Sequence, residues 1–476
     1  MLASTVDVES TRRLGLMRRA PSFGLLFLAT AGSSVGTYVA AVALTLDVKA
    51  RTGSGLWVAG LLIADFLPIV VIGFLLGPLV DRLSRRRLMI ASDLIRFGVF
   101  AALPFAGSAT AIVALAGVAG VATGLFRAAA LAGLPNLVPD DELTNANSLL
   151  QTIETLAWMV GPLLGTAMVA LWSPSVPYVI NAVTFLLSVA LIARIRESQL
   201  RSEESVTEGH WRDVAQGIRL VFGSAPLRTV LVVWNIVVIG TAAINVSEVF
   251  FTTDVLNAGD VGFGAFVAAS GLGLAVGSYL AAPALAKVGL KRHYAGSIAL
   301  MALGIAAAAL SPSIWFALPF VAGSAAGNGA AIICNQLLVQ RGAPDRYRGR
   351  ALAFIMSSNY AVLGLAMAAA GVLTDSVGPR WVLLGAGVAI LVAGFVSLGM
   401  TRWLPASRDE QQAVLGAQAD AAASQLVPAL DGGRVPTPKP AREGSAKGGL
   451  ERIAVLLEEI ESRRELEARR SRPAPD

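Results

Sequence analysis

The charged segment Asp81-Arg82-Leu83-Ser84-Arg85-Arg86-Arg87 lies between two long apolar runs, and with the residues before it the stretch reads Gly77-Pro78-Leu79-Val80-Asp81-Arg82-Leu83-Ser84-Arg85-Arg86-Arg87. The apolar runs at 57–80 and 88–107 are each long enough to cross a hydrocarbon core of about 30 Å. Because the connection is so short, the two predicted helices form an antiparallel pair with the basic turn on one side of the bilayer. Lys and Arg are retained on the cytoplasmic side, so the turn is predicted to face the cytosol.

The composition of the whole chain agrees with a membrane protein. Of its 476 residues 55% are hydrophobic and only 15% are charged, whereas soluble proteins carry roughly 25% charged residues. The net charge of +6 comes from Arg-rich turns and fits a membrane surface better than a nucleic acid. The lipid bilayer is therefore a predicted partner, and nucleic acid is not.

Apolar runs of spanning length recur along the chain. They lie at about 22–46, 57–80, 88–107, 109–133, 147–171, 176–195, 227–252, 261–286, 294–310, 314–339, 351–373 and 381–404. The basic residues are concentrated in alternate connections, which places both termini in the cytosol. The sequence thus predicts an all-α, multi-pass protein of the plasma (inner) membrane with about twelve transmembrane helices.

An internal repeat divides these spans into two halves. Pro78 and Arg87 correspond to Pro283 and Arg292 at one constant separation, as in a chain built from two pseudo-symmetric six-helix units. The predicted organisation is a cytosolic N-terminal segment (1–20), a six-helix half (21–196), a cytosolic linker (197–225), a second six-helix half (226–404) and a largely disordered cytosolic tail (405–476) with a helix near 450–467.

Few residues are suited to catalysis or to metal binding. The chain has one cysteine, Cys334, and two histidines, His210 and His293, which are far apart. We therefore expect neither a zinc site nor a Ser-His-Asp triad, and no enzyme activity, metal or cofactor. The phosphate-binding Gly-x-x-x-x-Gly-Lys-Ser/Thr motif does not occur, which argues against ATP as an energy source.

Ionisable residues within the predicted spans are functional candidates, because charge inside a membrane is costly. Asp65 has no basic neighbour on its own helix, so a role in proton coupling or substrate binding is favoured. Asp93 and Arg96 share a helix face, and Arg127 and Glu154 reach a similar depth from the next two spans. These four are predicted to form a paired charge cluster, and Glu154 is also a candidate for proton coupling or substrate binding.

The charged turn resembles the signature of the loop between the second and third spans in the major facilitator superfamily of transporters. Its motif residues are Gly77, Asp81, Arg82, Arg85 and Arg86. A carboxylate at a helix end can face the positive N-terminus of a neighbouring helix. Asp81 is accordingly expected to act as a latch that opens when the two halves move against each other.

Further stretches indicate which members of the superfamily the chain resembles. Gly161-Pro162-Leu163-Leu164-Gly165 resembles the antiporter motif of the exporters in this superfamily, with small residues for close helix contact and a proline that bends the helix. Leu134-Pro135-Asn136-Leu137-Val138-Pro139 and Asn181-Ala182-Val183-Thr184-Phe185 are similar to the branch of siderophore, macrolide and lysophospholipid transporters. The resemblance covers roughly residues 20–404.

The resemblance implies a secondary transporter that exports amphipathic small molecules such as drugs, antibiotics or siderophores. Proton antiport, with the proton gradient as the energy source, and alternating access are the expected mechanism. The polar and aromatic residues expected to face its cavity are Trp158, Asn181, Trp234, Asn235, Asn245, Asn328 and Asn359. Two alternatives stay open: a lysophospholipid flippase, and a membrane sensor that acts through its C-terminal helix, for which a protein partner is expected.

Overall fold

The computed structural model describes residues 15–75, 83–200 and 210–402, and within these ranges all regular structure is helical. The helices are α2 (Pro21–Thr52), α3 (Gly55–Leu75), α5 (Arg85–Ala102), α6 (Ala109–Gly133), α7 (Leu143–Leu171), α8 (Ser175–Ile192), α9 (His210–Gly223), α10 (Ala225–Phe250), α11 (Gly259–Val288), α12 (Leu290–Leu310), α13 (Ile314–Gly342), α14 (Asp345–Val377) and α15 (Pro379–Met400). A π-helical turn, Phe251–Val255, continues α10.

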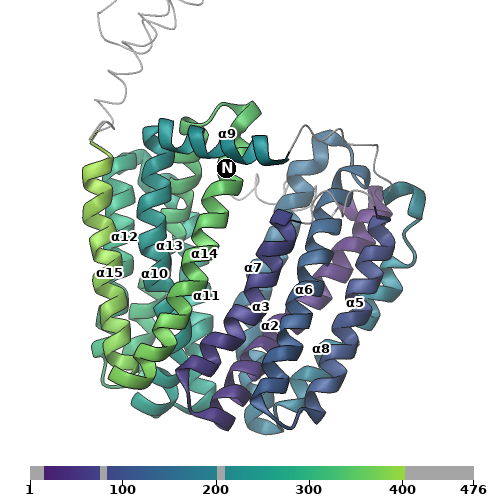
Figure 1. Ribbon diagram of the computed structural model, residues 1–476, viewed down its shortest axis with the longest axis horizontal. Coiled ribbons are helices and arrows are strands. Elements are labelled where there is room, and N and C mark those ends of the chain that lie inside the picture. Colours follow the sequence, from purple (N-terminus) through teal and green to yellow (C-terminus); the bar gives the residue numbers. More distant parts are fainter. Residues whose placement is uncertain (1–14, 76–82, 201–209, 403–476) are drawn as a thin grey trace, which may run out of the picture. The chain divides into compact units, whose positions relative to one another are not determined.

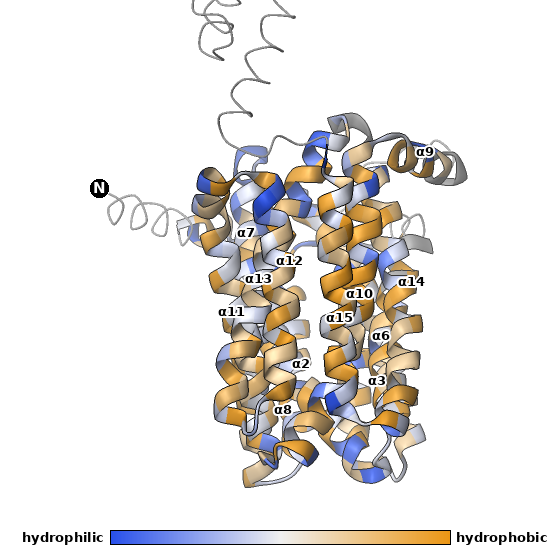
Figure 2. Ribbon diagram, turned by 90° about the vertical axis from the view of Figure 1, so that its left-hand side faces the viewer, coloured by the Kyte–Doolittle hydropathy of each residue, from blue (hydrophilic) through white to orange (hydrophobic). Residues whose placement is uncertain are grey.

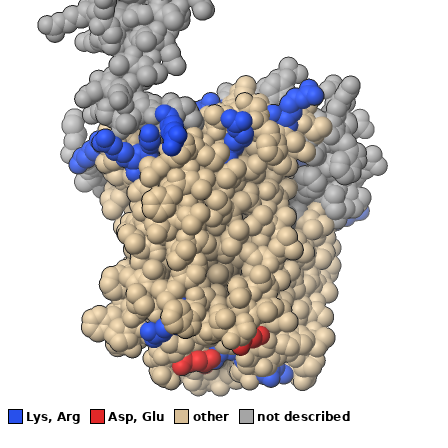
Figure 3. Space-filling view, turned by 60° about the vertical axis from the view of Figure 1, so that its left-hand side comes forward, with Lys and Arg blue, Asp and Glu red and all other residues tan. Residues whose placement is uncertain are grey.

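The helices match the predicted spans in number and order. Among the described residues 11 helices are long and apolar enough to cross a membrane. The remaining predicted span corresponds to α3, whose described apolar stretch is Gly55–Ile69. Figure 2 shows hydrophobic residues along the middle of the helices, and the face drawn in Figure 3 has a broad band without charged side chains. The all-α fold with two sets of spans is therefore confirmed.

The N-terminal bundle consists of α2, α3 and α5 to α8 (Figure 1). In it α2 packs against α7 and α8, and α6 packs against α3 and α5. One hydrophobic core contains Phe100 and Phe185, whose ring centroids are 5.7 Å apart. A second core contains the fully buried Phe23 together with Phe126.

In the C-terminal bundle α10 is the central helix. It packs against α13, α14 and α15, and α13 contacts α12 through Ser324, whose Oγ donates a hydrogen bond to the Met301 carbonyl over 2.7 Å. The two bundles meet where α3 packs against α14. Ala59 of α3 belongs there to a small buried cluster with Val246 of α10 and Met367 of α14.

The linker expected at 197–225 contains regular structure. A 3-10 turn at Glu197–Leu200 is followed by α9 after the undescribed residues 201–209. α9 contacts α14 and α10, so the connection between the bundles includes a helix that the polar composition did not indicate.

A separate part of the chain includes the described residues 282–294 and 401–402. It contains the turn from α11 to α12. Gly289 has a φ of 84° there, a left-handed conformation that favours glycine, and its N–H donates to the Leu285 carbonyl over 2.9 Å. The predicted tail at 405–476, with its helix at 450–467, lies outside the described residues.

Candidate functional site

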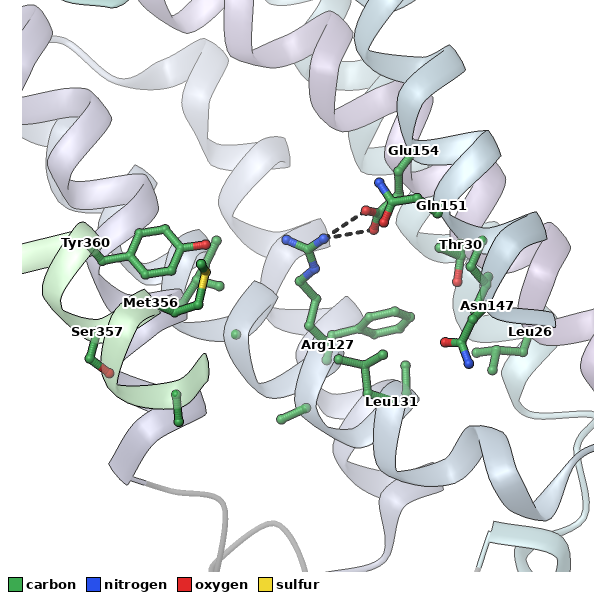
Figure 4. A pocket seen from close by; sticks show the side chains of 17 residues that line it. Leu26, Thr30, Arg127, Leu131, Asn147, Gln151, Glu154, Met356, Ser357 and Tyr360 are labelled. Atoms are coloured by element: carbon green, nitrogen blue, oxygen red, sulfur yellow. Dashed lines mark hydrogen bonds and ion pairs between the residues drawn. The ribbon is translucent and has the colours of Figure 1, made fainter. Parts of the chain in front are cut away.

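A cavity of about 530 Å³ lies between the two bundles. Helices α2, α6 and α7 contribute one wall, α14 contributes another, and Ile69 of α3 completes the lining. Figure 4 labels ten of the lining residues: Leu26, Thr30, Arg127, Leu131, Asn147, Gln151, Glu154, Met356, Ser357 and Tyr360. Most of the lining surface is apolar, and the polar groups are concentrated on the α6 and α7 side.

An ion pair provides the charge in this cavity. Nη2 of Arg127 on α6 lies 3.0 and 2.9 Å from the two carboxylate oxygens of Glu154 on α7 (Figure 4). The Arg127 side chain is 52% exposed and the Glu154 side chain is 27% exposed. The pair is therefore open to water and to a ligand, and the cavity can hold a charged or polar group next to an apolar body.

The opposite wall is formed by side chains of α14. Tyr360, Met356 and Ser357 follow each other at helical spacing (Figure 4). The Tyr360 ring also lies 5.8 Å from the ring of Phe66 on α3. This contact joins the bundles beside the cavity, so Tyr360 belongs both to the lining and to the interface between the bundles.

The stretch Gly161–Gly165 brings α7 close to α2. A Cβ atom at Gly161 would lie 2.5 Å from Cβ of Tyr38, and one at Gly165 would collide with the carbonyl oxygen of Val39. Only residues without a side chain allow this approach, which holds Glu154, two turns earlier on α7, at the cavity. The structure thus gives the motif a packing role, and its role in antiport stays a prediction.

The predicted charge cluster consists of two separate ion pairs. Asp93 and Arg96 pair with each other on α5, with side chains that are 0% and 5% exposed. The guanidinium carbon of Arg96 lies 4.5 Å from the Phe126 ring and 4.4 Å from the Phe185 ring. Because Phe126 also lines the cavity, this pair supports the cavity wall from behind, whereas Arg127 pairs with Glu154 inside the cavity.

Asp65 does not line the cavity. Its half-buried side chain forms no hydrogen bond or ion pair with the described part of the chain, and its backbone oxygen lies against Gly120 of α6. This contact places Asp65 two turns of α6 before Arg127, and its role in proton coupling stays a prediction.

None of the seven side chains expected in the cavity is among the residues that line it. Asn181 is fully buried and lies against Gly36 of α2. Asn235 donates a hydrogen bond to Ser358 Oγ over 3.1 Å. Composition shows that polar side chains occur in a span, but the face that they occupy depends on packing between helices. A polar stripe of Asn147, Gln151 and Glu154 at helical spacing was the signal that could have found the lining.

At one end the bundles are joined by polar contacts. Lys49 Nζ at the end of α2 lies 2.5 Å from Asp254 Oδ1 in the π-helical turn. Asp375 in the last turn of α14 accepts hydrogen bonds from Ser54 Oγ (2.7 Å) and from the backbone N–H groups of Gly55 (2.5 Å) and Leu56 (3.2 Å). These contacts close the end of the interface at which α3 begins.

The described part of the charged turn caps the end of α8. Arg85 is buried, and Arg86 donates hydrogen bonds to the carbonyl oxygens of Ile192 and Ala193 at the end of α8. A cation at the C-terminus of a helix is favourable. Gly77, Asp81 and Arg82 lie outside the described residues, so the expected latch stays a prediction.

Comparison with known families settles the class of protein. The profile of a family described as "transmembrane secretion effector", part of the major facilitator superfamily, matches residues 17–427. The chain belongs to this family. As a family member it is an efflux-type membrane transporter and not an enzyme.

Relatives and solved structures agree with the family. The chain is 27% identical over 405 residues to the multidrug efflux pump Tap of Mycolicibacterium fortuitum, covering 81% of this chain and 97% of that protein. It is 24% identical over 243 residues to macrolide efflux protein A of Streptococcus pyogenes, covering 48% of this chain and 58% of that protein. A bacterial homologue of the lysosomal transporter Spinster, solved in an inward-facing and unoccupied conformation, superposes with a TM-score of 0.65 at 12% identity over 81% of this chain and 97% of its own.

Proposed function

We propose that the chain exports amphipathic small molecules, drugs or antibiotics among them, by proton antiport and alternating access. The names of the relatives, a multidrug efflux pump and a macrolide efflux protein, support this substrate class. The cavity supports it as well, because an apolar lining with a single charged pair suits a ligand that has an apolar body and one polar end.

The observation that carries the proposal is the Arg127–Glu154 pair in the cavity. A proton that binds Glu154 removes its negative charge and breaks the ion pair, which leaves Arg127 free to turn towards a substrate or away from it. Proton and substrate then compete for the same ion pair. Binding of one therefore lowers the affinity of the protein for the other, as linkage requires. Asp65, whose backbone packs against Gly120 of α6, provides a second carboxylate within the bundle.

The proposed orientation follows from the basic residues. Arg86, Arg341 and Arg350 lie at the ends of spans opposite the end that Lys49 and Asp375 close. With the basic end in the cytosol of a plasma-membrane protein, the contacts at Lys49 and Asp375 form a closed outer end, and the cavity belongs to a state accessible from the cytosol. Both termini are then cytoplasmic.

The test uses the full chain in proteoliposomes, with efflux of a fluorescent amphipathic dye driven by a pH gradient. Glu154→Gln should remove the stimulation by the gradient and keep downhill transport, because the amide cannot carry the proton. Asp65→Asn should keep dye binding and reduce the same stimulation if its carboxylate shares the proton. Asp260→Asn, a carboxylate outside the cavity at the start of α11, is the control. Unchanged gradient-driven efflux in the Glu154, Asp65 and double variants would refute proton coupling through this wall.

A further inference from the structure

A second concave site lies outside the cavity, on the linker helix. A groove of about 450 Å³ is lined by Gln216, Arg219, Leu220, Gly223, Ser224 and Arg350. We call it the α9 groove. It lies where α9 meets the start of α10 and the second turn of α14, which places it at the ends of two membrane-spanning helices.

Close contacts fix the shape of the α9 groove. A Cβ atom at Gly217 would lie 2.6 Å from the carbonyl oxygen of Arg350, so α9 lies directly on α14. Ser224 Oγ donates a hydrogen bond to the Gly342 carbonyl over 2.9 Å. These two contacts fix the position of α9 against α14 and the end of α13.

The charge of the α9 groove is positive. Its lining contains Arg219 and Arg350 and no acidic residue among the described side chains. The guanidinium of Arg350 donates a hydrogen bond to Gln216, which holds it at the groove wall. Arg219 is exposed and forms no ion pair with a described residue. Two guanidinium groups in one groove suit a phosphate group, which they can bind with several charge-assisted hydrogen bonds.

Close to Arg219, α9 exposes apolar side chains. Ile218 is 37% exposed and Phe222, one turn later, is 54% exposed. Phe222 is held by Phe354 of α14 at a ring distance of 6.2 Å. A soluble anion would use the arginines and leave these side chains in water, whereas a phospholipid has both a phosphate and an acyl chain to occupy the two surfaces.

We infer that the α9 groove binds the phosphate headgroup of an anionic phospholipid from the adjacent leaflet. Basic pockets at the ends of transmembrane helices are suited to such headgroups. Because α9 belongs to the only connection along the chain between the two bundles, the bound lipid steadies the position of this connection. The inference needs the membrane setting of the family and does not depend on the proposed substrate or on proton coupling.

The test measures lipid binding to the purified full-length protein. Detergent-solubilised protein is titrated with phosphatidylglycerol or phosphatidylcholine, and retained lipid is counted by native mass spectrometry while thermal stability is followed in parallel. We expect a preference for phosphatidylglycerol. Arg219→Ala and Arg350→Ala should each weaken it about fivefold, since one basic residue at an anionic surface contributes about 1 kcal/mol. Arg228→Ala, which removes an exposed arginine outside the groove, should leave it unchanged.

Two results would overturn the inference. One is an unchanged preference for phosphatidylglycerol in the Arg219→Ala/Arg350→Ala variant. The other is equal stabilisation by glycerol phosphate, which has the same anionic group without acyl chains and would indicate a site for a soluble phosphate. Arg219→Lys is the control for folding. It keeps the positive charge, so it should retain most of the preference for phosphatidylglycerol that Arg219→Ala loses.

Discussion

Asp375 is the clearest case of a residue whose position makes sense only in the folded chain. It lies in the last turn of α14, where a carboxylate is unfavourable for its own helix because both carry negative charge. Across the interface it accepts the N–H groups of Gly55 and Leu56, which begin α3 and have no partner within their own helix. The carboxylate therefore stabilises the start of a helix in the other bundle.

Asp375→Ala should loosen the closed end. Loss of a carboxylate at a helix N-terminus costs about 1 kcal/mol, which is about a fivefold shift in a two-state equilibrium. Spin labels at Trp172 and Trp315, with Cys334→Ser as background, should show a larger population of long distances by electron paramagnetic resonance. Asp260→Ala at the start of α11 is the control. An unchanged distance distribution would mean that Asp375 only caps α3.

At the residue scale the sequence predicted a paired cluster of four charged residues, and the structure divides it into two ion pairs. Arg127 and Glu154 were placed at a similar depth, and their ion pair follows from that depth. The separation of Asp93 and Arg96 from them depends on Phe126, which lies between the buried pair and the cavity. Asp375 was missed because two of its three partners are backbone N–H groups, which the side-chain chemistry of the sequence does not reveal.

The contact between α7 and α2 depends on the absence of side chains at two turns of α7. Gly165→Ala places a methyl group against the backbone of Val39, so the helices must separate and Glu154 moves with α7. We expect a loss of thermal stability of about 1–3 kcal/mol, as for overpacked cores, together with reduced efflux.

The matched control for this contact is Gly98→Ala on α5, where an added Cβ meets nothing within 4 Å. It should be neutral or stabilising by up to about 1 kcal/mol, because alanine favours a helix more than glycine does. Thermal unfolding followed by circular dichroism in detergent distinguishes the two. Equal effects of both substitutions would show that α7 can move away from α2 without cost.

The helices themselves were predictable because length and apolarity are local properties. Each predicted apolar run has a helix in the described part of the chain, including α3 (Gly55–Leu75) for the run at 57–80. α9 was not predicted, since a short helix in a polar linker depends on packing, here of Gly217 against Arg350. The lining of the cavity likewise depends on which helix faces meet, and α14 contributes Tyr360 through that packing alone.

At the scale of the whole molecule, the Lys49–Asp254 ion pair is a contact that holds the two bundles together at one end. Its side chains are 18% and 53% exposed, so it contributes at most about 1 kcal/mol. Lys49→Asp should lengthen the Trp172–Trp315 label distance and change the efflux rate up to about fivefold, since two carboxylates then repel. The exchange Lys49→Asp with Asp254→Lys should restore both. Failure of the exchanged pair to restore either quantity would assign the effect to other neighbours of Lys49.

The tail should be dispensable for transport. Residues after Ser407 are polar and rich in Pro and Gly, and they follow the last span. A chain truncated after Ser407 should export the dye in vesicles within a few-fold of the full chain, and a chain truncated at 427, the end of the family match, is the control. Loss of export in a truncated chain that still inserts and folds would show that the tail controls the transporter.

Lys49 and Asp254 are separated by 205 residues, the same separation that relates Pro78 to Pro283 in the internal repeat. They thus occupy corresponding positions of the internal repeat, and these two positions contact each other between the bundles. A pair of identical subunits would bring lysine against lysine or aspartate against aspartate at this point. The attraction between Lys49 and Asp254 therefore requires that the two halves of the chain differ at this position.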